Sequence, residues 1–104
     1  MSRIDALKGF LADNPADSFS RYALALEYIK IDRFGNAVGE FESIVRNDPD
    51  YLATYYQLGK AYEHEDSTTE AEQTYRTGIE VASRAGDTHA RDELQEALSL
   101  LLGT

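Results

Sequence analysis

The chain of 104 residues contains no cysteine and no tryptophan, and it has only 2 prolines. Without cysteine, a disulfide framework, a thiolate metal site and a cysteine nucleophile are all excluded, so stability must come from packing. No stretch approaches the roughly 18 consecutive apolar residues that a membrane span requires, and the first residues lack the apolar run of a signal peptide. We therefore predict a cytoplasmic protein with no membrane-embedded part.

Positive charge is also scarce, because 10 Lys and Arg residues stand against 19 Asp and Glu residues, for a formal net charge of −9. The imbalance is larger in the second half of the chain, where residues 51–104 carry 10 acidic and 4 basic residues. Such a chain repels phosphate backbones and anionic lipid surfaces. We predict that neither nucleic acid nor a membrane is a partner, and that a basic or apolar partner is favoured. An acidic surface that serves only solubility, or a high-salt habitat, is the plainer interpretation.

The sequence lacks the motifs that carry catalysis. It has no G-x-S-x-G nucleophile elbow and no G-x-x-x-x-G-K phosphate loop. Its two histidines invite a metal hypothesis, since His64 lies among acidic residues and His89 precedes Glu93 by four positions, but neither spacing is specific. We predict no enzyme activity, no cofactor and no metal site.

What the sequence does contain is an internal repeat, in which residues of matching type recur at a separation of 34. Proline, aromatic, aliphatic and small residues all follow the same offset. The matched pairs are Pro15 and Pro49, Tyr22 and Tyr56, Leu24 and Leu58, Ala25 and Gly59, Tyr28 and Tyr62, Ala37 and Ala71, and Phe41 and Tyr75.

This pattern resembles the tetratricopeptide repeat family, whose signature reads W-x2-L-G-x2-Y, then A-x3-F, then P. The first copy reads Arg21-x2-Leu24-Ala25-x2-Tyr28, then Ala37-x3-Phe41 and Pro49. The second copy reads Tyr55-x2-Leu58-Gly59-x2-Tyr62, then Ala71-x3-Tyr75 and Gly78. The sequence departs from the family signature at two points. Arg21 replaces the usual large aromatic residue, and the second copy has no closing proline. The missing proline predicts a longer last helix in the second copy.

The resemblance implies an all-α fold, a right-handed stack of antiparallel helix hairpins in a short solenoid. We predict a single domain over 1–104 that consists of a half-repeat helix in 1–14, repeats over 18–51 and 52–85, and a capping helix over 87–102. Small residues would let paired helices approach closely, and larger apolar side chains would fill the space between them. The predicted core is Leu24, Tyr28, Phe41, Leu58, Tyr62 and Tyr75.

Helix start and stop signals place about six helices over 3–13, 18–31, 36–47, 51–65, 68–85 and 88–102. Ser2, Asp17 and Asp87 are predicted N-caps, and Gly86 is a predicted helix stop. The segment Ser67-x-x-Glu70 reads as a capping box. We further predict a turn over 32–35, and that residues 47–50 cap the fourth helix.

The helix over 18–31 is apolar almost all round, which predicts that it is covered on two sides. One side packs in its hairpin, and the other falls where the family forms its inner, concave face. The matching face of the helix over 51–65 is more polar. By this resemblance the partner-binding residues are Phe19, Tyr22, Leu26, Ile29, Tyr56, Gln57, Lys60 and His64.

These observations favour a scaffold or adaptor that binds a protein or peptide with an apolar anchor or a basic character. The family's basic clamp for acidic chaperone tails is absent, because Tyr22 and Leu26 stand where its first residues would be. The alternative is a self-association or structural module. In it the apolar face is covered either by the last helix of the same chain or by a second copy of the chain in a homodimer. A third interpretation is that the chain is a piece of a longer repeat protein.

Overall fold

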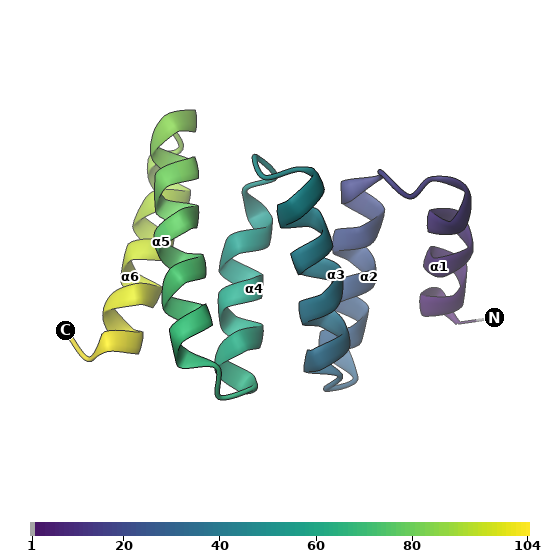
Figure 1. Cartoon of the computed structure of the whole chain (residues 1–104), viewed down its shortest axis with the longest axis horizontal. Coiled ribbons are helices and arrows are strands. Elements are labelled where there is room, and N and C mark those ends of the chain that lie inside the picture. The colour runs from purple at the N-terminus through teal and green to yellow at the C-terminus, as the bar shows by residue number, and fades with distance from the viewer. Residues whose placement is uncertain (1) are drawn as a thin grey trace. The chain divides into compact units, whose positions relative to one another are not determined.

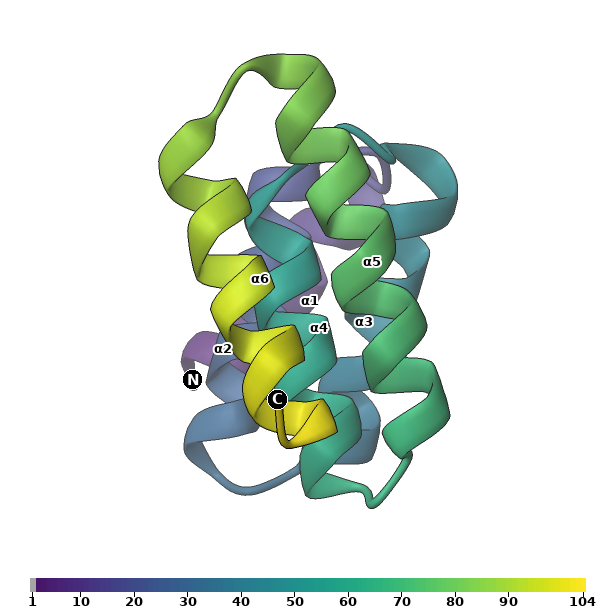
Figure 2. The same ribbon diagram turned by 90° about the vertical axis from the view of Figure 1, so that its left-hand side faces the viewer.

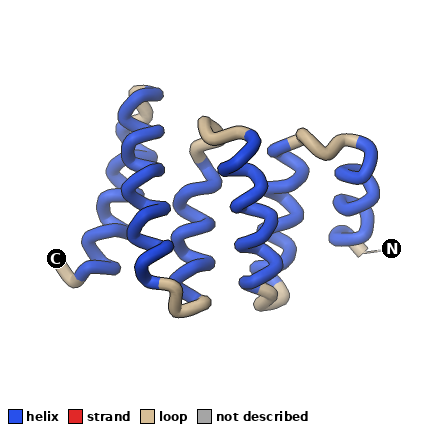
Figure 3. Tube along the Cα trace, in the orientation of Figure 1, coloured by secondary structure: helices blue, strands red, loops and turns tan. Residues whose placement is uncertain are grey.

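The structure is a computed structural model that describes residues 2–104, which form six α-helices and no strand (Figure 1). Short loops join the helices (Figure 3). The predicted all-α class is thereby confirmed for the described residues, and Met1, the first residue of the predicted half-repeat segment, lies outside them. The helices are α1 (Arg3–Asp13), α2 (Ser18–Lys30), α3 (Phe34–Asn47), α4 (Ala53–His64), α5 (Thr68–Ala85) and α6 (Thr88–Leu102).

The chain divides into two compact units, of which the first ends at Tyr51 and the second begins at Leu52. This boundary falls between the two predicted repeats. In the first unit α2 packs against both α1 and α3. In the second unit α5 packs against α4 and α6, and α4 also contacts α6. Figure 2 shows α5 and α6 side by side in the second unit, with the turn that joins them.

Four helices end in the same way, with a residue in the left-handed conformation and two backbone hydrogen bonds that close the last turn. The left-handed residues are Asp32, Asp66, Gly86 and Gly103. At the end of α2, for example, the Asp32 amide donates to the Ile29 carbonyl and the Arg33 amide donates to the Tyr28 carbonyl. Only Gly86 was predicted; Asp32 and Asp66 were missed because aspartate adopts this conformation less often than glycine, and the stop at Gly103 was not predicted.

The left-handed Asp32 explains why the predicted turn over 32–35 is too long. Because Asp32 alone reverses the chain, Phe34 and Gly35 already belong to α3, which begins two residues earlier than predicted. The prediction for the start of α4 is also wrong. Its N-cap is Leu52, which has no side-chain hydrogen bond, and the Asp48 carboxylate instead accepts from the Ser18 hydroxyl at 2.7 Å.

The caps of the other helices follow the sequence more closely. Ser2, Asp17 and Asp87 each accept a hydrogen bond from an amide in the first turn of α1, α2 and α6. Ser67 is the N-cap of α5, but its side chain makes no cap hydrogen bond, so the predicted capping box does not form.

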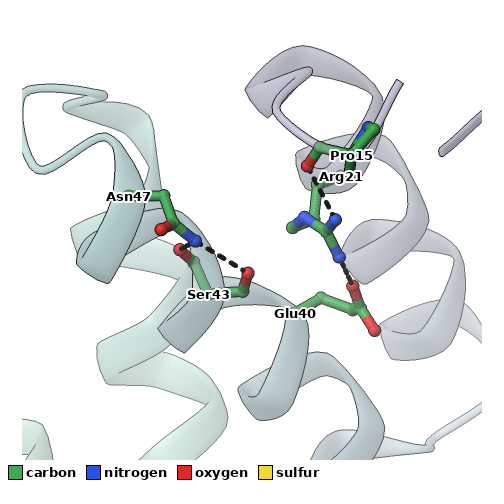
Figure 4. Close-up of polar contacts among 5 residues, drawn as sticks. All are labelled: Pro15, Arg21, Glu40, Ser43 and Asn47. Atoms are coloured by element: carbon green, nitrogen blue, oxygen red, sulfur yellow. Dashed lines mark hydrogen bonds and ion pairs between the residues drawn. The ribbon is translucent and has the colours of Figure 1, made fainter. Parts of the chain in front are cut away.

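The core of the first unit contains the predicted small and large residues. Ala25, Ala37 and Phe41 are fully buried, and Leu24 and Tyr28 are nearly so. Arg21, which replaces the family's aromatic residue, joins three segments by polar contacts instead. Its guanidinium donates to the Glu40 carboxylate at 2.7 Å and to the Pro15 carbonyl at 2.9 Å (Figure 4).

The core of the second unit depends on two glycines that bring helices together. A Cβ atom at Gly59 of α4 would lie 2.2 Å from the ring of Tyr75 in α5, and one at Gly78 of α5 would lie 2.6 Å from the Cβ of Tyr55 in α4. Tyr75 is fully buried and Leu58 nearly so, whereas the predicted core residue Tyr62 is only half-buried. The α4–α5 pair is therefore held at a distance that no larger residue at these positions permits.

Candidate functional site

The second unit has an open groove of about 130 Å³ on the side where α4 meets α6. Two of its lining residues come from α4 and four from α6. They are Tyr56, Lys60, Glu93, Glu96, Ala97 and Leu100. The groove thus combines an aromatic ring, two aliphatic side chains, one ammonium and two carboxylates.

Helical spacing explains why these residues share one groove. Tyr56 and Lys60 are four residues apart on α4, and the α6 residues at positions 93, 96, 97 and 100 recur at intervals that keep them on one face. The Asp87 cap fixes where α6 begins, and Leu94 of α6 is buried close to Gly78 of α5. The α5 helix therefore sets the position of α6 beside α4.

Lys60 is engaged by residues of its own helix. Its ammonium lies 5.6 Å from the centre of the Tyr56 ring, a cation–π contact, and 3.8 Å from the Glu63 carboxylate. The same Glu63 oxygen accepts the hydroxyl hydrogen bond of buried Tyr75 at 2.5 Å. Burial, together with this bond to Glu63, raises the pKa of the Tyr75 hydroxyl above its ordinary value. Lys60 therefore belongs to a chain of contacts that runs from the groove to the core.

The α6 side of the groove is far more exposed. Glu93 and Glu96 are both exposed. Within residues 2–104 the only ion pair of either is the 3.7 Å contact between the Glu93 carboxylate and His89. Leu100 is 71% exposed, so most of this large apolar side chain faces solvent. This side of the groove offers two carboxylates and one aliphatic group to solvent.

The four sequence-predicted site residues of α2 lie in the first unit and differ in burial. Phe19 is 73% exposed, so no part of residues 2–104 supplies the cover that was expected over it. Leu26 and Ile29 are half-buried. Tyr22 is half-buried too, and its ring lies 5.8 Å from the rings of both Phe41 and Tyr51, so it contributes to the packing of the first unit.

The other four predicted residues lie on α4. Tyr56 and Lys60 line the groove, whereas Gln57 is half-buried and His64 is the exposed last residue of the helix, and neither is among the lining residues of the groove in the described chain. The residues that the prediction missed are those of α6. Glu93 and Glu96 lie in the predicted capping helix over 87–102, but they were not among the predicted site residues. The signal that distinguishes them is their helical spacing, seven residues from Leu100 for Glu93 and four for Glu96.

Two kinds of feature are absent from residues 2–104. No group of three or more His, Cys, Asp or Glu side chains is arranged to hold a metal ion. None of the helices in this part of the chain is both long enough and apolar enough to cross a membrane.

Comparison with known proteins is consistent across sequence and structure. The sequence model of the tetratricopeptide repeat family matches residues 52–84. A tetratricopeptide repeat domain protein from Salinibacter ruber, solved by NMR, is 48% identical, with a TM-score of 0.81 over 86% of this chain and 90% of that chain. The TPR repeat-containing protein PA0015 of Pseudomonas aeruginosa is 28% identical over 91 residues, or 88% of this chain and 87% of that protein. The first TPR of Spaghetti (RPAP3), solved with an HSP90 peptide, has a TM-score of 0.76 at 21% identity over 97% of this chain and 80% of that chain, which is a likeness of fold.

Proposed function

We propose that this chain, which belongs to the tetratricopeptide repeat family, is a non-catalytic scaffold that binds a protein or peptide. The observation that carries the proposal is the α4/α6 groove, which exposed Leu100 and half-buried Tyr56 line together with polar residues. Apolar anchors surrounded by polar groups are typical of peptide-binding surfaces. The related fold of RPAP3, which holds a peptide in its solved structure, supports the same role.

We propose two further binding surfaces, one on α2 of the first unit and one on α4 of the second, each formed by exposed or half-buried residues. On α2 these are Phe19, Tyr22, Leu26 and Ile29, and on α4 they are Tyr56, Gln57, Lys60 and His64. Because Tyr22 also packs against Phe41 and Tyr51, replacing it would disturb the first unit as well as any binding. Leu100 is therefore the better residue with which to test binding.

A peptide-display library screened against the purified chain tests the proposal. We expect enriched peptides to bind the wild-type protein and to lose at least tenfold in affinity for Leu100→Asp, since a charge replaces the apolar anchor. Thr77→Asp on α5 is the matched control, because Thr77 is also exposed and the change in charge is the same. The proposal fails if no peptide is enriched, or if both variants lose binding equally while circular dichroism shows intact helices.

Self-association is a second candidate function, favoured by exposed apolar residues of the first unit. Phe10 is 46% exposed, Phe19 is 73% exposed and Ile31 is 53% exposed. Covering such side chains with a second copy would remove apolar surface from water. Sedimentation equilibrium tests this candidate: it requires a dimer that the double substitution Phe19→Ser and Ile31→Ser dissociates, and a monomer at all concentrations would reject it.

A further inference from the structure

We infer that the occupant of the α4/α6 groove is a basic amphipathic helix, which presents two Lys or Arg side chains to Glu93 and Glu96 and an apolar side chain to Leu100. The inference rests on the proposed function and specifies the partner's chemistry. The spacing, the charges and the exposure of the groove residues all favour this partner.

The spacing favours a helical partner. Glu93, Glu96 and Leu100 are separated by three and four residues on α6, so they form one ridge of about 10 Å at a rise of 1.5 Å per residue. A second helix whose side chains follow the same spacing of three and four, in either direction, can place one residue against each of them. An extended chain covers this length in about three residues and points alternate side chains to opposite faces. It would match at most two of the three positions.

The charges favour a basic partner. Lys60, the cation in the groove, is already engaged by the Tyr56 ring and the Glu63 carboxylate. Glu96 has no ion pair within residues 2–104, and Glu93 has only its 3.7 Å contact with exposed His89. The groove belongs to a unit with 10 acidic and 4 basic residues, which attracts cations over a longer range. Ion pairs at such an exposed site mainly determine partner choice and association rate.

The apolar part of the groove supplies the anchor. Leu100 is 71% exposed, and Ala97 and the Tyr56 ring lie in the same groove. An aliphatic side chain of the partner would cover these groups and exclude water from them. The partner that fits carries two basic residues three positions apart and an apolar residue four positions further on, read in one direction or the other.

Titration of the whole, isotope-labelled chain with synthetic peptides, followed by NMR amide shifts, tests the inference. The first peptide is a helix that carries the basic–x2–basic–x3–Leu pattern, made in both sequence directions. The second peptide has glutamate in place of the basic residues, and the third has glutamine in their place. The fourth peptide keeps the basic residues but contains a central proline that breaks the helix. We expect the basic helix to shift the amide signals of residues 56–60 and 93–100 and to bind roughly tenfold more weakly at high salt. The other three peptides should bind at least tenfold more weakly than the basic helix.

Charge reversal on the protein provides the matched control. The double substitution Glu93→Arg and Glu96→Arg should abolish binding of the basic helix and favour the acidic one. Glu65→Arg with Glu80→Arg makes the same change in net charge at two exposed positions that do not line the groove, and it should leave the preference for the basic helix intact. Equal loss of binding in both variants would overturn the inference, because only the overall charge would matter.

The outcomes separate this inference from the proposed function. If the glutamine peptide binds the groove as tightly as the basic one, or the proline-containing peptide binds as tightly as the helix, the partner's inferred chemistry is wrong and the scaffold proposal stands. If no peptide shifts the groove signals and display selection also yields none, both are wrong.

Discussion

Replacing Gly59 by alanine adds a single methyl group at the closest approach of α4 and α5. The new Cβ would lie 2.2 Å from Cε1 of the Tyr75 ring and 2.6 Å from Cζ, whereas ordinary contact begins near 3.4 Å. Tyr75 is fully buried, and its hydroxyl is tied to the Glu63 carboxylate. The ring cannot withdraw by more than 1 Å without moving α5 or losing that hydrogen bond.

The magnitude follows from three contributions. Overpacking of a core costs about 1–3 kcal/mol, and a weakened hydrogen bond to a carboxylate costs up to about 1.5–3 kcal/mol. The higher helix propensity of alanine offsets about 1 kcal/mol. We therefore expect the free energy of unfolding to fall by about 2–4 kcal/mol, which lowers Tm by at least about 8 °C for a domain of this size.

Urea unfolding followed by circular dichroism measures this change, and Gly39→Ala is the control. Gly39 also lies inside a helix, but a Cβ there meets nothing within 4 Å. The control should be more stable than wild type by about 0.5–1 kcal/mol, because alanine loses less backbone entropy on folding. The reasoning is refuted if Gly59→Ala matches or exceeds wild type in stability, or if Gly39→Ala is destabilised as strongly as Gly59→Ala.

Three further predictions concern polar groups in the two units. Thr54→Val should raise the free energy of unfolding by about 1 kcal/mol, because the fully buried Thr54 hydroxyl has no hydrogen-bond partner within the described chain. A clearly lower Tm for this variant in a thermal melt would mean that the hydroxyl has a partner. Tyr75→Phe should cost about 1.5–3 kcal/mol at neutral pH. Because the folded-state pKa of Tyr75 is raised, the extra stability of the wild type over Tyr75→Phe should decrease as pH rises above about 10. Urea unfolding at several pH values should show the two free energies of unfolding converging. Arg21→Met should cost about 1–2 kcal/mol through its lost bonds to Glu40 and Pro15, with Arg46→Met as the exposed control, and equal melting curves for the two would contradict this role.

Much of the fold could be predicted because the 34-residue repeat pattern indicates which positions must hold small residues. Ala25, Ala37 and Ala71 are fully buried, as the 34-residue pattern indicates, and Gly59 leaves no room for a Cβ. The errors lie at helix ends, where a single residue decides the geometry. Asp32 reverses the chain at a positive φ of 59°, and sequence alone does not distinguish this from the longer turn predicted around Gly35.

The candidate site was harder to predict, because it depends on how α6 packs against its neighbours. The spacing of Tyr56 and Lys60 already placed them on one face of α4. Glu93 and Glu96, by contrast, look like ordinary surface residues until the burial of Leu94 fixes which side of α6 turns toward α4 and α5. A prediction from spacing alone identifies the face of a helix, and only tertiary packing shows what that face meets.

The ring of Tyr56 beneath the Lys60 ammonium has a practical consequence. Because the chain has 7 tyrosines, no tryptophan and only weakly emitting phenylalanines besides, its ultraviolet emission is dominated by tyrosine. A ligand that displaces the ammonium from the ring, or shields the ring from water, changes the surroundings of one of these emitters directly. The groove therefore contains a native optical reporter, and occupancy can be followed without attaching a dye.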